Sequence, residues 1–154
     1  MKKLVMIALG ASFILNSFAQ QKKKEEVSAL AKSAFTTKFP DAQKIKWSIE
    51  KPGEYEAEFL INGVETSAVF DASGKFIESE TAIKESELAQ PIKATLAKDF
   101  ANYKLEEIEK STDAKGTVTY EIAAKKDKKE YEIVFDKNGK LLNLKEETED
   151  KEKD

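Results

Sequence analysis

The stretch that decides the fold is residues 54–75, which read EYEAEFLINGVETSAVFDASGK. Apolar side chains alternate with acidic or polar ones on both sides of Asn62-Gly63, as in two strands of a sheet with one buried face. Asn-Gly is a strong signal for a two-residue hairpin turn. That turn sets the register, so Tyr55 is predicted opposite Phe70, on the buried face.

The same pattern returns 65 residues later, where residues 119–140 read TYEIAAKKDKKEYEIVFDKNGK. Tyr-Glu, Val-Phe-Asp and Gly-Lys coincide in the two stretches without a gap. Here the turn is predicted at Asp127-Lys128, with Tyr120 opposite Phe135. Both stretches close with Asp-x-x-Gly, which is typical of a type I turn that ends in a left-handed glycine. We interpret the chain as two copies of one unit.

A helix is predicted before each set of strands. From Val27 to Phe35, apolar residues fall at i, i+3, i+4, i+7 and i+8, which makes one apolar stripe. Pro40 ends this helix, because proline moves the preceding residue out of the α region. Pro91 suits the first position of the second helix, and apolar residues as far as Phe100 share one of its faces.

These patterns predict an α+β fold over residues 20–147. Two tandem units are predicted, each a helix followed by a four-stranded antiparallel meander. The units span about residues 25–83 and 88–147. Residues 148–154 carry no apolar side chain and are expected to be a charged disordered tail.

The N-terminus has the three-part layout of a secretory signal peptide, predicted over residues 1–19. Two lysines precede an apolar run from Leu4 to Leu15, and small residues follow at Ser17 and Ala19. Helix over that run would rise about 18 Å, too short for the roughly 30 Å hydrocarbon core of a bilayer. The mature protein is therefore expected in the periplasm or outside the cell, without membrane insertion.

The composition excludes several classes of site. The chain has no Cys, His or Arg, and its formal net charge is −3. It can form no disulfide and no ordinary zinc, copper or haem site, and it lacks a Ser–His or Cys–His nucleophile pair. An acidic protein is also a poor ligand for nucleic acid. We therefore expect no cofactor, no metal and no catalytic residue of these kinds, and we expect a monomer.

Glutamates dominate the positions that alternate with the predicted core. Paired carboxylates can act as general acid and base, but only when a cleft desolvates one of them. We expect water to keep their pKa values ordinary on an open sheet face. That face is the candidate interface, carried by Glu56, Glu58, Glu65, Val69, Glu121, Glu130 and Val134. The turns at Asp71 and Asp136 resemble part of a calcium loop but lack its later ligands, so no metal is expected there.

The chain resembles the PepSY-like family of exported bacterial proteins, which is similar in architecture to the beta-lactamase inhibitor protein. The residues that carry this resemblance are Phe39-Pro40-Asp41-Ala42, Ile45, Tyr55-Glu56, Phe70-Asp71-x-x-Gly74-Lys75 and Phe135-Asp136-x-x-Gly139-Lys140. The end of the signal, Ser17-Phe18-Ala19-Gln20, looks like those of exported proteins of Bacteroidota. The resemblance implies that the two units form one curved eight-stranded antiparallel sheet with the helices on one face. The inhibitor uses its open concave face to clasp a protein, so the resemblance favours a non-enzymatic binding role here.

Two functions are compatible with these sequence features. The first is a non-enzymatic binding module, inhibitor-like in character, whose partner is another envelope or secreted protein. The second is a periplasmic hydrolase that uses its carboxylates. A large exposed apolar patch on the sheet would favour binding, and a deep pocket with two carboxylates of raised pKa would favour hydrolysis.

Overall fold

The computed structural model describes residues 26–147, so the predicted signal peptide and charged tail lie outside the described residues. Two α-helices, one short 3₁₀ helix and eight strands follow one another along the chain. In order they are α1 (Ala29–Lys38), β1 (Gln43–Lys51), β2 (Glu54–Ile61), β3 (Val64–Asp71), β4 (Phe76–Ala82), η1 (Glu85–Glu87), α2 (Gln90–Asp99), β5 (Lys104–Asp113), β6 (Val118–Lys126), β7 (Lys129–Asp136) and β8 (Leu141–Glu147).

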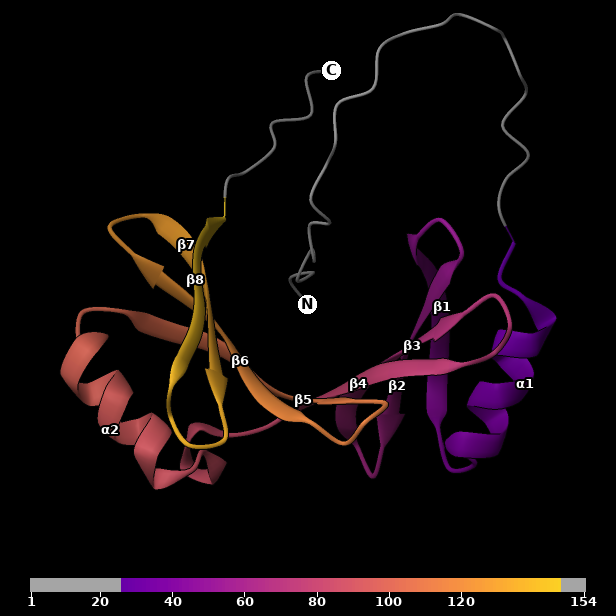
Figure 1. The fold of residues 1–154 in the computed structure, drawn as a ribbon, viewed down its shortest axis with the longest axis horizontal. Helices are drawn as coiled ribbons and strands as arrows, with labels where there is room; N and C mark the ends of the chain where they lie inside the picture. Colours follow the sequence, from indigo (N-terminus) through magenta and orange to yellow (C-terminus); the bar gives the residue numbers. More distant parts are fainter. Residues whose placement is uncertain (1–25, 148–154) are drawn as a thin grey trace, which may run out of the picture.

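The eight strands form one antiparallel sheet in chain order, β1 to β8. In β2 and β3, Tyr55 pairs with Phe70 as predicted, and in β6 and β7 Tyr120 pairs with Phe135. The α+β fold with two helices and one eight-stranded antiparallel sheet is therefore confirmed. Figure 1 shows the bent sheet, with α1 and α2 outside the bend at opposite ends of the molecule.

Both helices pack on the same face of the sheet. Residues that are directly paired across neighbouring strands have their side chains on the same face of the sheet. Four such pairs connect β2 to β6, in the order Ala57, Ala68, Ser79, Thr112 and Val118. The first of these residues packs in the core below α1, and the last lies on the side of β6 that faces α2. The opposite, concave side of the bend is called the open face below.

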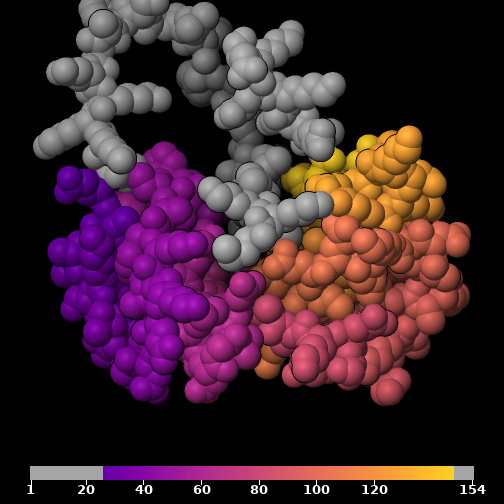
Figure 2. Space-filling model, turned by 180° about the vertical axis from the view of Figure 1, so that it is seen from behind, coloured from indigo at the N-terminus to yellow at the C-terminus, as the bar shows by residue number. Residues whose placement is uncertain are grey.

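Each helix covers a separate apolar core. The core of α1 contains Ala31 and Phe35 of the helix itself and residues of β2 and β3, namely Tyr55, Ala57, Phe59, Ala68 and Phe70. The core of α2 contains Ile92 and Leu96 of the helix itself, Leu88 and Phe100 on either side of it, and residues of β5, β6 and β7, namely Ile108, Ile122, Ala124, Ile133 and Phe135. The two clusters share no residue, and neither includes the paired segments of β4 and β5, residues 78–82 and 109–113, which lie between the two cores. Figure 2 shows the two halves side by side from behind.

Two Asp-x-x-Gly turns hold the sheet to the helices. Asp136 accepts hydrogen bonds from the backbone N–H groups of Asn138 and Lys140, at 2.8 and 3.0 Å. Gly139 has a φ of +81°, and a Cβ added to it would lie 2.6 Å from the carbonyl carbon of Pro91 at the start of α2. Gly74 approaches α1 in the same way. Only glycine allows this contact, because it lacks Cβ and adopts positive φ at no steric cost.

The edge strands are less buried than apolar–polar alternation predicts. Ile45 and Ile49 alternate like core residues, yet their side chains are 45% and 41% exposed. The register of β1 shifts after Gln43, where Lys44 has a φ of +55°. Leu144 on the other edge strand, β8, is similarly exposed. No helix in residues 26–147 is long and apolar enough to cross a membrane.

Candidate binding surface

All seven residues of the predicted interface lie on the open face. Glu56, Glu58 and Glu65 point away from the helices because they alternate with the core residues of β2 and β3. Val69 pairs with Glu56, and on the other half of the sheet Glu121 pairs with Val134. The last of the seven, Glu130, lies in phase with Val134 on β7.

The middle strands add glutamates that the sequence analysis did not single out. Glu80 of β4 pairs with Ser111 of β5, and Glu109 of β5 pairs directly with Glu121 of β6. Because β4 and β5 are neighbours, these acids lie at the centre of the open face. We call Glu80, Glu109 and Glu121 the glutamate trio.

The glutamate trio is partly removed from water. Glu80 is only 6% exposed, and its Oε1 atom is buried without a hydrogen-bond partner. Burial, followed by the charges of Glu121 and Glu109, raises the pKa of Glu80 to about 9. Burial also raises the pKa of Glu109 and of Glu121 to about 7, with neighbouring carboxylates adding to the effect. The expectation of ordinary pKa values on this face is therefore wrong for Glu121, since the bent sheet desolvates its centre.

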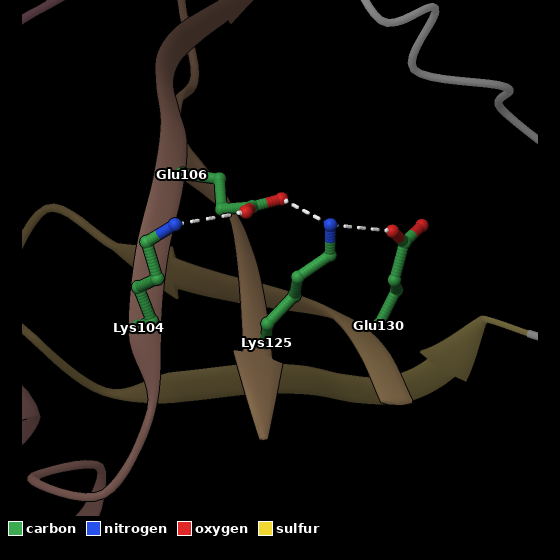
Figure 3. Close-up of polar contacts among 4 residues, drawn as sticks. All are labelled: Lys104, Glu106, Lys125 and Glu130. Carbon is green, nitrogen blue, oxygen red and sulfur yellow. Dashed lines mark hydrogen bonds and ion pairs between the residues drawn. The ribbon is translucent and has the colours of Figure 1, made fainter. Parts of the chain in front are cut away.

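The lysines pair with acids away from this centre. Lys125 of β6 bridges Glu106 of β5 and Glu130 of β7, with both N–O distances at 3.0 Å. Lys104 completes the row at 3.5 Å from Glu106 (Figure 3). These hydrogen bonds from lysine lower the pKa of Glu106. Glu130 is thus already paired, and it differs in this respect from the trio.

The glutamate trio does not coincide with a grouping of metal ligands or with either of two pockets in the part of the chain that the structure describes. Among residues 26–147, no three or more Asp or Glu side chains are grouped so that they could hold a metal ion. Two pockets of about 410 and 430 Å³ exist, and neither is lined by a member of the trio. Among the described residues, the larger exposed apolar side chains are Ile45, Ile49, Leu141, Leu142 and Leu144 of the edge strands, Leu30 of α1 and Val64 at the start of β3.

The sequence pattern did not identify Glu80 and Glu109 as residues of the open face, for a physical reason. Next to these acids, the opposite sides of β4 and β5 carry Ser79, Thr81 and Lys110, which belong to neither apolar core, although Ile108 further along β5 does. Apolar–polar alternation is therefore weak in both strands. A usable signal was the spacing of the acids themselves, at every second position in Glu78 and Glu80 and again in Glu107 and Glu109.

Comparisons with known proteins agree with this architecture. A BLIP-like protein from Bacteroides fragilis superposes with a TM-score of 0.71 at 20% identity, over 86% of this chain and 94% of that one. A DUF2874 family protein from Bacteroides ovatus gives 0.71 at 21% identity, over 79% and 89%. A protein from Bacteroides eggerthii described as "putative periplasmic" gives 0.72 at 20% identity, over 79% and 90%. At these identities the likeness shows the fold alone.

A search of curated proteins finds no match to the chain. A family model described as "Putative beta-lactamase-inhibitor-like, PepSY-like" matches residues 53–143, from the turn before β2 into β8. The match includes both Asp-x-x-Gly turns on which the resemblance was based. Because it spans more than half of the sequence, this protein belongs to the PepSY-like, beta-lactamase-inhibitor-like family.

Proposed function

We propose that this protein is an exported, non-catalytic binding module that recognises another envelope or secreted protein through its open face. The observation that carries the proposal is that both helices pack on one side of the sheet, while no described element covers the other. Family membership and the BLIP-like neighbour support a binding role over a catalytic one.

The open face is large enough for this role. Eight strands spaced about 4.8 Å apart span roughly 34 Å, and strands of seven residues are about 23 Å long. The product, somewhat under 800 Å², is close to what each partner of a standard protein interface contributes. If the two-copy interpretation of the sequence holds, equivalent strands of both units supply this surface.

Export rests on the layout of residues 1–19 and is consistent with the periplasmic description of one structural neighbour. Protein recovered from the periplasm or the medium should begin at Gln20 when its N-terminus is sequenced. Membrane-bound protein that retains Met1 would contradict export.

The open face is tested with tagged protein as bait in extracts of the native envelope. The double variant Glu56→Lys/Glu121→Lys should lose a protein that the wild type captures, because it reverses one charge on each half of the face. Glu85→Lys/Asp99→Lys is the matched control, since both of its residues are exposed and lie next to or at the end of α2. Equal capture by all three proteins would exclude the open face as the binding surface.

Hydrolysis is the second candidate, and the raised pKa values of Glu109 and Glu121 favour it. Against it, neither of the two described pockets is lined by these carboxylates. Turnover of a panel of glycoside and ester substrates that is abolished in Glu109→Gln would support this alternative over binding.

A further inference from the structure

The centre of the open face has a concentration of acid without a matching base. Among the described residues, every ion pair of a lysine lies elsewhere, and none includes a member of the glutamate trio. The nearest charged groups that act on the trio are also carboxylates, namely Glu56, Glu65, Glu78, Glu107 and Glu132. The face therefore lacks a cation where its carboxylates are most buried.

The register places the trio within reach of one cationic group. Glu109 and Glu121 are directly opposite each other, and residues paired in this way have Cβ atoms about 5 Å apart. Glu80 pairs with Ser111, two residues from Glu109 on the same strand, so it is a diagonal neighbour at about 7–8 Å. A guanidinium or ammonium group between the three could contact all of them.

The buried, unpartnered Oε1 atom of Glu80 is the observation that points to a ligand. An acceptor oxygen that is buried and unpartnered has lost its hydration, and a folded protein normally supplies a replacement hydrogen bond. Its side chain faces the same centre as Glu109 and Glu121, whose charges act on it most strongly. Because the folded protein keeps Glu80 protonated near neutral pH, a bound cation has to offset its own desolvation and the cost of ionising Glu80, and the second cost falls as the pH rises.

We propose that the glutamate trio receives a lysine or arginine side chain from a basic segment of the partner protein, with Glu80 as the innermost acceptor. This inference rests on the proposed function and specifies the partner's chemistry. The cation is a side chain rather than a metal ion, because the described acids are not grouped to coordinate one. Arginine suits the site well, since its planar fork has five donors for several carboxylate oxygens.

Binding should release protons. The raised pKa values mean that the free trio holds protons near neutral pH, and a bound cation favours the ionised form of each acid. Affinity for a basic peptide is therefore expected to rise between pH 6 and pH 9, by up to about tenfold per pH unit for one released proton. Attraction to carboxylates of ordinary pKa would not change over this range.

The test uses acetylated, amidated octaarginine and octalysine as probes and calorimetry with the exported protein in buffers of different ionisation enthalpy. Glu80→Gln should weaken octaarginine binding at pH 8 by about tenfold or more and reduce the proton release, because one charge-assisted contact is lost. Glu109→Gln/Glu121→Gln should have a similar effect. The matched variant Glu26→Gln/Glu85→Gln removes two exposed charges and should change the affinity less than about twofold.

Affinity that does not depend on pH, or that falls equally in the matched variant, would overturn the proposal. Calcium binding with the same proton release and the same loss in Glu80→Gln would overturn it in favour of a metal site. If octaarginine fails to bind while Glu56→Lys/Glu121→Lys still loses its captured protein, the basic-segment proposal is wrong and the binding face stands.

Discussion

Glu80 shows how one buried acid makes the stability of the whole protein depend on pH. Its pKa is about 9 in the folded state, well above the ordinary value of 4.5. The folded state therefore holds a proton that the unfolded chain releases, and stability is lost as the pH rises through this window. One such group gives a slope of about 1.4 kcal/mol per pH unit between roughly pH 5 and pH 9.

The substitution Glu80→Gln should remove much of this slope, because glutamine keeps the shape of the protonated acid and does not ionise. We expect the free energy of unfolding of the wild type, measured with urea, to fall from pH 7 to pH 9, and that of the variant to change much less. The exposed Glu85→Gln is the control and should follow the wild type. A wild type that is equally stable at both pH values would show that Glu80 is not buried as a protonated acid.

Single residues also mark where prediction from the sequence ends. Tyr55 and Phe70 were placed correctly because alternation and an Asn-Gly turn agree on one register. The burial of Glu80 could not be predicted in this way. It depends on the bend of the sheet and on the pairing of β4 with β5, which places charges distant in sequence next to one another.

At the scale of elements, three turns share the same Asp-x-x-Gly pattern but differ in their surroundings. Asp113 accepts backbone hydrogen bonds from Lys115 and Thr117, just as Asp136 does from its own turn. The third turn, which ends at Gly116, was not predicted as a member of this set. All three glycines have φ values between +81° and +85°, yet nothing lies within 4 Å of a Cβ added to Gly116.

Substitutions in these turns therefore distinguish the energetic cost of backbone strain from that of a steric clash with a helix. Gly116→Ala should lose about 1–2 kcal/mol of unfolding free energy, the cost of a left-handed conformation in a residue with a Cβ. Gly139→Ala should lose about 1–3 kcal/mol more, since its Cβ would lie 2.6 Å from Pro91 and α2 would have to move. Urea denaturation compares the two variants. Equal losses of unfolding free energy in the two variants would mean that α2 moves away from the added Cβ at little energetic cost.

The edge strand β1 shows the limit of prediction for whole elements. Ile45 and Ile49 alternate with polar residues, a pattern that predicts a strand with both on its buried face, yet both side chains are exposed. Burial of an edge strand depends on how far a helix extends across the sheet, and α1 has only ten residues. The sequence pattern records which side chains could be buried, and the packing partners determine which of them are.

At the scale of the molecule, the sheet is continuous while the core is not. β4 and β5 pair along five residues of each strand, from Glu78 to Ala82 and from Glu109 to Asp113. A polar pocket of about 410 Å³, lined in part by Ser79 and Thr112, lies on the helix side of this join. The two apolar clusters are thus coupled mainly through backbone hydrogen bonds.

This arrangement predicts that the two halves open separately. Phe70 lies in the core below α1, with its ring centroid 5.6 Å from that of Phe76, and Phe135 lies in the core below α2, 5.9 Å from Phe100. Truncation of either to Ala should cost about 3–5 kcal/mol. Native-state hydrogen exchange should then be faster mainly in β1–β3 for Phe70→Ala and mainly in β6–β8 for Phe135→Ala, because each substitution destabilises only the opening of its own core. Each variant serves as the control for the other, and equal acceleration in all eight strands would show that the β4–β5 join makes the molecule one cooperative unit.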